Sequence, residues 1–162
     1  MPGTPIRLIG LISQVLKCQM DPMGVRGDGN SGQPSACFPS AISLGSTWDM
    51  GLINKLGIEL GSEAKLKDVD VLLGPTINIH RHPLGGRHFE SYSEDPYLTG
   101  RIAIEYVNGV QSKNVASCLK HFVGNDTEFR RYAVSSNIDE RTLREIYLLP
   151  FEMGIKESNA KS

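Results

Sequence analysis

The chain has 162 residues, a formal net charge of −1 and 40% hydrophobic residues. That length matches one typical domain, and that apolar content can build a buried core, which excludes an intrinsically disordered chain. Lys and Arg are scattered, so nothing resembles the basic stripe that nucleic acid or an anionic lipid surface requires. We therefore expect no nucleic-acid partner and no membrane partner, and the oligomeric state stays unknown.

The N-terminus and the cysteines do not assign a compartment. No apolar segment reaches the roughly 18–20 residues of a membrane span, and "MPGTPIRLIGLISQVLKCQ" is a poor secretion signal because prolines interrupt its start. Cys18, Cys37 and Cys118 are odd in number and lack the paired spacing of a zinc site. We expect the three cysteines to be ordinary thiols. The localisation stays unknown, since the parent protein could be secreted or cytoplasmic.

The first predicted strand lies within residues 6–16 and is followed by a loop rich in Gly, Pro and Ser. Asp49 then offers an N-cap for a helix with one apolar face, made of Ile53, Leu56, Leu60 and Ala64. Trp48 stands just before this helix, where a lone Trp is more typical of a core than of a stacking platform for a ligand.

A second strand, residues 69–73, is short, β-branched and stopped by Gly74 and Pro75. Asp95 and Pro96 are then predicted to be the N-cap and the first residue of another helix. Its apolar residues recur every four positions and are Leu98, Ile102, Tyr106 and Val110.

The third strand is predicted over residues 115–122, and its polar loop leads into a helix over residues 139–149, where Pro150 interrupts or kinks it. Strands that alternate with helices predict an α/β fold with a parallel sheet. Such sheets bind ligands at the carboxyl ends of their strands. Loops of about 15–20 residues are uncommon in a compact domain unless they line a site, so these three loops predict a binding face.

Arg87 is the first candidate ligand residue. It lies in "RHPLGGRHFESYSEDPYLTG", and a guanidinium held by tight turns suits bidentate hydrogen bonds to vicinal hydroxyls or to a carboxylate. In the alternative interpretation Arg87 pairs with Glu90 or Glu94 and only pins the loop. An anion cradle built from Gly85, Gly86 and Arg87 is disfavoured, because glycines are few and the motif does not open a helix.

Lys120 and His121 end the third strand and would present an ammonium and an imidazole at the binding face. The alternative is a strand end that simply reaches solvent. Phe122 and Val123 are apolar again, so the pair interrupts a stretch expected to be buried. Buried Lys or His usually needs a partner or a task, which favours a functional role.

Three histidines, His80, His82 and His88, raise the possibility of a metal site. No carboxylate at fixed helical spacing completes a ligand set, and Arg81 and Arg87 would repel a cation. We expect no metal and no cofactor.

Four segments resemble glycoside hydrolase family three: "STWD", "SEAKLKDVDVLLGPTINIHRHPLGGRHFESYSEDPYLTG", "LKHFVGND" and "DERTLREIYLLPF". From Phe38 to Pro150 the chain is similar to the N-terminal domain of the β-glucosidases of that family, above all the fungal ones. The resemblance implies a partial (β/α)8 TIM barrel, N-terminal portion only. Residues 38–162 would form this incomplete barrel portion, and residues 1–37 an atypical N-terminal segment with a DP.G.R loop.

The resemblance also implies site residues. Arg87 of "GGR.FE" and Lys120 and His121 of "KHF" match positions that hydrogen-bond the hydroxyls of a glucosyl unit in the family. "KHFVGND" resembles the glucosidase branch rather than the N-acetylglucosaminidases, which tend to carry "KHFPGHG". The family's sugar-binding aspartate, in "DGP.G.R", falls on Met20 in a gapless alignment, with Asp21 one place later. Either Asp21 serves by a local shift or the contact is lost.

The implied activity is retaining hydrolysis of terminal non-reducing β-D-glucosyl residues, as in polysaccharide and cellulose degradation, with a β-glucoside or oligosaccharide as substrate. In the family the nucleophile lies in an "SDW"-like motif beyond the point where this chain stops, and the general acid lies later still. The resemblance thus implies that this chain supplies the sugar-binding part of the site and no catalytic residue. The alternative is a catalytically inactive truncated fragment or a carbohydrate-binding remnant.

Retaining hydrolysis needs two carboxylates about 5–5.5 Å apart, and the sequence selects no such pair. The candidates are Asp21, Glu90, Glu94, Asp95, Asp126 and Glu128. We interpret Asp95 as a helix cap, Glu90 and Glu94 as partners of Arg87, and Asp126 and Glu128 as partners of Arg130 and Arg131.

Overall fold

The computed structural model describes residues 18–19, 23–26, 34–158 and 160–162. Three short strands, β1 (Cys18–Gln19), β2 (Val71–Leu72) and β3 (Ala116–Ser117), pair in parallel in the order β1-β2-β3. The predicted strand at residues 6–16 lies outside the described residues, as does Asp21. The second and third strands are confirmed, although the regular pairing covers two residues in each.

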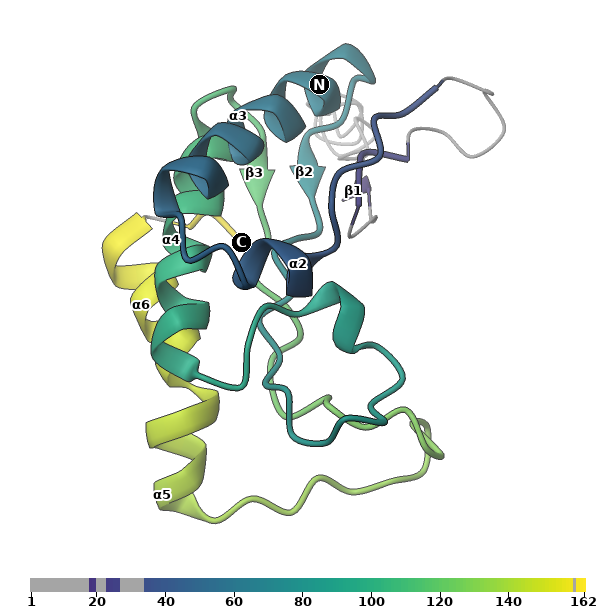
Figure 1. Ribbon diagram of the computed structural model, residues 1–162, viewed down its shortest axis with the longest axis vertical. Helices are drawn as coiled ribbons and strands as arrows, with labels where there is room; N and C mark the ends of the chain where they lie inside the picture. Colours follow the sequence, from purple (N-terminus) through teal and green to yellow (C-terminus); the bar gives the residue numbers. More distant parts are fainter. Residues whose placement is uncertain (1–17, 20–22, 27–33, 159) are drawn as a thin grey trace, which may run out of the picture.

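In Figure 1 the long loops after β2 and β3 lie together beyond the strand tips. The helical elements are α2 (Ala41–Gly45), α3 (Met50–Leu66), the 3-10 turn η1 (His88–Glu90), α4 (Pro96–Gln111), α5 (Glu140–Thr142), the π-helical turn η2 (Leu143–Tyr147) and α6 (Leu149–Ser158). Among the described helices, none is long and apolar enough to cross a membrane.

Helices α3 and α4 confirm the sequence prediction in both their caps and their buried faces. The Asp49 carboxylate accepts a hydrogen bond from the Leu52 N–H at 2.9 Å, and that of Asp95 accepts from the Tyr97 N–H at 2.8 Å. The eight apolar residues predicted to face the core, Ile53, Leu56, Leu60, Ala64, Leu98, Ile102, Tyr106 and Val110, are all buried.

Two glycines allow α3 and α4 to touch at the level of their backbones. A Cβ atom on Gly109 would lie 2.5 Å from the carbonyl oxygen of Asn54 and 2.8 Å from Cα of Gly57. A side chain at this crossing would therefore push the two helices apart.

The C-terminal helix differs from the prediction, because helical structure continues past Leu149 to Ser158. Pro150 lies in the first turn of α6, where a missing N–H removes no bond within the helix. Before it, the Leu148 N–H donates to the Leu143 carbonyl at 2.8 Å, which is the wider turn of a π-helix.

The expectation of a core position for Trp48 is wrong, since its side chain is 71% exposed. Trp48 precedes the cap residue Asp49 and has a φ of 56°, so its backbone lies outside the helix. The side chain of Trp48 therefore does not lie on the buried face of α3.

Candidate functional site

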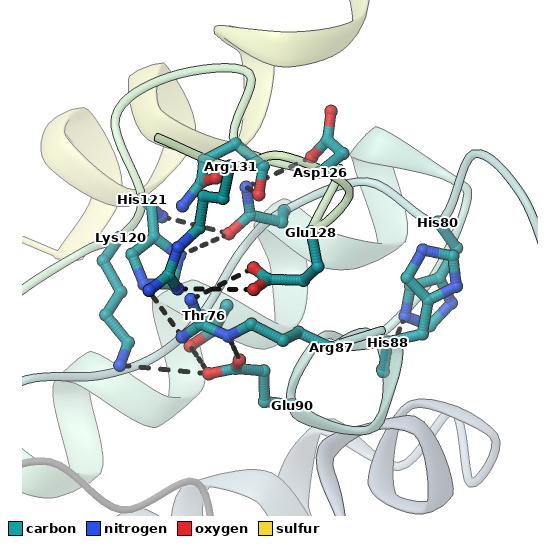
Figure 2. A network of polar contacts seen from close by, with 12 residues as sticks. Thr76, His80, Arg87, His88, Glu90, Lys120, His121, Asp126, Glu128 and Arg131 are labelled. Carbon is teal, nitrogen blue, oxygen red and sulfur yellow. Dashed lines mark hydrogen bonds and ion pairs between the residues drawn. The ribbon is translucent and has the colours of Figure 1, made fainter. Parts of the chain in front are cut away.

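Arg87 and Glu90 form the centre of a polar cluster in the loop after β2 (Figure 2). Arg87 is the residue before η1, and its Nε contacts Oε1 of Glu90, which lies one helical turn later. The Glu90 residue is only 4% exposed, and its Oε2 accepts a hydrogen bond from Thr76 Oγ1 at 3.2 Å. The predicted pairing of Arg87 with Glu90 is confirmed, whereas Glu94 is an exposed residue.

Lys120 joins the same carboxylate from the segment after β3. Lys120 forms a parallel bridge with Thr76, and its Nζ lies 4.0 Å from Oε2 of Glu90. Lys120 is 9% exposed, so it is a buried cation beside a buried anion. The side chain of Phe122, however, is 74% exposed, so the expectation that the chain stays buried after Lys120 and His121 is wrong.

Glu128 connects the loop after β3 to Arg87. Its Oε1 lies 3.5 Å from Nη1 of Arg87, and its Oε2 lies 3.4 Å from Nη1 of Arg131. The expected pairing of Glu128 with Arg131 is confirmed. Arg130 instead stacks over the ring of Phe129, 5.5 Å from its centroid.

His121 lies between Arg87 and Asn78. Its Nε2 is 3.3 Å from Nη2 of Arg87, and its Nδ1 is 2.8 Å from Oδ1 of Asn78. Burial lowers the pKa of His121 below its usual value, and the nearby charges of Lys120 and Arg87 lower it further. The imidazole is therefore neutral at neutral pH.

Asn78 and Asp126 are site residues that the motif reasoning missed or interpreted differently. Asn78 Nδ2 donates to Asp126 Oδ1 at 3.1 Å, and among the described residues no ion pair joins Asp126 to Arg130 or Arg131 as expected. Ile77 and Ile79 are buried, which places Asn78 on the opposite face of this extended segment, together with Thr76. The alternation of polar and apolar residues in "TINIH" is the sequence signal that could have identified Asn78 as a residue of this face.

The three histidines considered as metal ligands do not converge. His80 and His88 stack with ring centroids 4.7 Å apart, and His80 Nε2 lies 3.0 Å from each of the carbonyl oxygens of His88 and Ser91. His82 is exposed, and its Nδ1 accepts from the Leu84 N–H. Across the described ranges, no three His, Cys, Asp or Glu residues are grouped as metal ligands.

Two spaces adjoin the cluster. A cavity of about 10 Å³ lies among Thr76, Asn78, Arg87, Glu90 and His121 and can hold roughly one water molecule. A more open hollow of about 570 Å³ lies next to it. The lining of the hollow includes Arg81, Gly85, Gly86, Glu128 and Phe129.

Chemically, the cluster combines groups that only donate hydrogen bonds with groups that accept them. Arg87 and Lys120 donate, whereas Glu90 and Glu128 accept. Hydroxyl groups both donate and accept, so a ligand with several hydroxyls can use both sets. An α/β fold with parallel strands and this polar cluster at their carboxyl ends has the site placement of barrel-type enzymes.

The chain belongs to glycosyl hydrolase family 3, because residues 18–162 match the Glycosyl hydrolase family 3 N terminal domain. It is 54% identical to a beta-glucosidase of Rhizobium radiobacter over 149 residues, which are 91% of this chain and 18% of that protein. It is 53% identical to a putative beta-glucosidase of Schizosaccharomyces pombe over 87% of this chain and 17% of that protein.

Solved structures give the same assignment. The beta-glucosidase of Kluyveromyces marxianus in complex with glucose aligns with a TM-score of 0.86 and 45% identity, covering 89% of this chain and 18% of that one. Beta-glucosidase 3B of Thermotoga neapolitana in complex with glucose aligns with a TM-score of 0.82 and 45% identity, over 87% and 20% of the two chains. The expected family and the partial α/β barrel fold are confirmed, and the chain spans about a fifth of these relatives' length.

Proposed function

We propose that this chain supplies the sugar-binding part of a β-glucosidase-type glycoside hydrolase, which removes terminal non-reducing β-D-glucosyl residues with retention. The observation that carries the proposal is the convergence of Arg87, Lys120 and His121 around Glu90, at the carboxyl ends of two adjacent strands. Relatives named beta-glucosidase and neighbours in complex with glucose support it. The proposed division of the chain is an N-terminal segment of residues 1–37 and an incomplete barrel portion of residues 38–162.

In this proposal the sugar exchanges hydrogen bonds with groups that are already paired. Arg87 contacts Glu90 and Glu128, and a glucosyl hydroxyl would share or replace the Glu128 contact, which at 3.5 Å is a loose one. The hollow beside Glu128 would take the rest of the ligand. Asp21 would add a further sugar contact from the N-terminal segment.

The binding claim is tested by calorimetric titration of glucose into the 162-residue chain. Arg87→Ala and Lys120→Ala each remove a charged donor, and we expect affinity to fall roughly 10- to 100-fold. Arg141→Ala and Lys156→Ala are matched controls, since these side chains form exposed ion pairs elsewhere and should leave glucose affinity unchanged. Asp21→Ala tests the further contact proposed for Asp21 in the same assay. Equal affinities in all variants would contradict the proposed site.

A second candidate function, sugar binding without catalysis, is favoured by the pairing of the site carboxylates. Glu90 and Glu128 are both paired with Arg87, so in this candidate function they hold the Arg87 side chain in place rather than react with the sugar. We therefore expect the 162-residue chain to show no turnover of an aryl β-glucoside. Robust cleavage that Arg87→Ala abolishes would contradict this and would assign catalysis to a carboxylate of this chain.

A further inference from the structure

We infer that Asn78 is a positioning residue that holds His121 as the neutral tautomer protonated on Nδ1, so that Nε2 carries the lone pair. That lone pair accepts from Arg87 in the free protein, and it accepts from the ligand when a ligand hydroxyl displaces the Arg87 contact. The ligand half of this inference rests on the proposed function. The tautomer half rests only on the contacts of Asn78 and His121.

The orientation of the Asn78 amide is fixed by partners that can play one role each. Its Nδ2 faces the Asn125 carbonyl at 3.1 Å and Oδ1 of Asp126 at 3.1 Å, and both of these oxygens accept. Its Oδ1 faces the backbone N–H of His121 at 3.2 Å, which only donates. Turning the amide over would set donor against donor on one side and acceptor against acceptor on the other.

The tautomer follows from that orientation. His121 Nδ1 lies 2.8 Å from Oδ1 of Asn78, an acceptor, so Nδ1 must carry the hydrogen. His121 Nε2 lies 3.3 Å from Nη2 of Arg87, a donor that never deprotonates in proteins, so Nε2 must accept. The two sides of the ring independently require the same neutral form.

Asp126 supports Asn78 from behind. Its Oδ1 accepts from the Asn78 amide and also from the Ile79 N–H at 3.3 Å, so it fixes the side chain and the backbone of the same segment. Four charged groups act on the imidazole. The positive charges of Lys120 and Arg87 lower the pKa of His121, and the negative charges of Glu90 and Glu128 raise it. A second proton on Nε2 would point at the Arg87 guanidinium, which disfavours the imidazolium.

The consequence for recognition is a division of roles. Arg87 and Lys120 can only donate, so they read hydroxyl oxygens, whereas Nε2 of His121 can only accept, so it reads a hydroxyl hydrogen. A ligand that carries fluorine in place of that hydroxyl keeps a weak acceptor and loses the donor, so it should bind as poorly as the deoxy analogue. At positions read by Arg87 or Lys120 the fluorinated analogue should bind better than the deoxy one.

The tautomer is measured by ¹⁵N NMR of the 162-residue chain labelled at histidine. We expect a pyrrole-type Nδ1 and a pyridine-type Nε2 for His121. Asn78→Ala should remove this pattern and give mixed tautomers, and Asp126→Ala should weaken it. Asp126→Asn should retain it, because an amide oxygen can replace Oδ1. Asn54→Ala, which removes an amide that bonds Glu105 between α3 and α4, should also retain it.

The wild-type spectrum alone can overturn the inference. A protonated Nε2, or an imidazolium at neutral pH, would refute it even if Asn78→Ala does not fold. An unchanged tautomer in folded Asn78→Ala would also refute it. A chimera, in which residues 18–162 replace the matching segment of a full-length relative, gives the same readout inside a complete barrel.

Titration of glucose and of its monodeoxy and monodeoxyfluoro analogues tests the ligand half. We expect one position at which both analogues lose affinity about equally, by roughly 10-fold for one hydrogen bond, and we expect Asn78→Ala to lower glucose affinity in the same range. Finding no such position would refute the ligand half. If glucose itself does not bind, the proposed function fails, while the NMR result still decides the tautomer.

Discussion

Glu90 is the buried counter-ion of two cations of the site, Arg87 and Lys120. Removing its charge should therefore lower the free energy of unfolding by an amount that can be calculated. Glu90→Gln keeps the shape of the side chain and removes its charge. The Glu90 side chain is 3% exposed, and those of Arg87 and Lys120 are 25% and 11% exposed, so Lys120 would lose a buried counter-ion and Arg87 a counter-ion at a partly exposed position. Breaking a buried pair costs about 3–5 kcal/mol, and the partial exposure of Arg87 places the expectation near the lower limit, about 3 kcal/mol.

Chemical denaturation followed by circular dichroism measures this loss of unfolding free energy. The matched control is Glu145→Gln, whose partner Arg141 is on the surface with a side chain 83% exposed, and where we expect a loss of about 0.2–1 kcal/mol. Arg87→Met in the Glu90→Gln background should cost less than in the wild type, because the two residues share one interaction. Equal losses for Glu90→Gln and its control would refute the view that Glu90 neutralises the site.

Two further predictions concern stability. Because burial and the charges of Lys120 and Arg87 lower the pKa of His121, the unfolded state binds more protons below the unfolded value of about 6.5, so unfolding free energy should fall as pH falls below that point. His121→Gln should flatten this slope in denaturation curves between neutral and mildly acidic pH, and an equal slope in both proteins would contradict the cause. Gly109→Ala should lower the melting temperature at a cost of about 1–3 kcal/mol, since the added carbon would lie 2.5 Å from the Asn54 carbonyl oxygen. Gly51→Ala is the control at the exposed start of α3, where the added carbon would lie 3.3 Å from the side-chain oxygen of Asp49, so the change should stay within about 0.5 kcal/mol. Similar losses for the two variants would argue against close packing of α3 on α4.

The sequence predicted α3 and α4 well because their signals are local. A capping carboxylate and an apolar residue every three or four positions describe a helix end and a helix face without reference to the rest of the molecule. Asp49 and Asp95 fulfil this role at both helix starts. By contrast, Trp48 has no periodic neighbours of its own, so its exposure depended on backbone geometry that composition does not encode.

The C-terminal helix shows the limit of reading one residue as a stop signal. Pro150 ends a helix when it falls in the interior, and it starts one when it falls in the first turn. The choice is made by the wide turn before it, where Leu148 bonds back to Leu143. That turn depends on packing rather than on residue type.

In the site, motif reasoning found Arg87, Lys120 and His121 and passed over Asn78, the amide that contacts His121. Arg87, Lys120 and His121 lie in recognisable motifs, and the structure brings them together. Asn78 lies in the alternating segment "TINIH", which indicates its face of the chain, but its partners in the loop after β3 are identified only by the structure.

Glu128 holds one arginine on each of its two oxygens, Arg87 toward the site and Arg131 toward the surface. A molecule that competes for Arg87 leaves this carboxylate to Arg131 alone. Arg131 in turn donates a hydrogen bond to the hydroxyl of Tyr132 at 2.8 Å, and Tyr132 is 94% exposed. A single acidic group thereby joins the buried part of the cluster to the protein surface through a continuous chain of polar contacts.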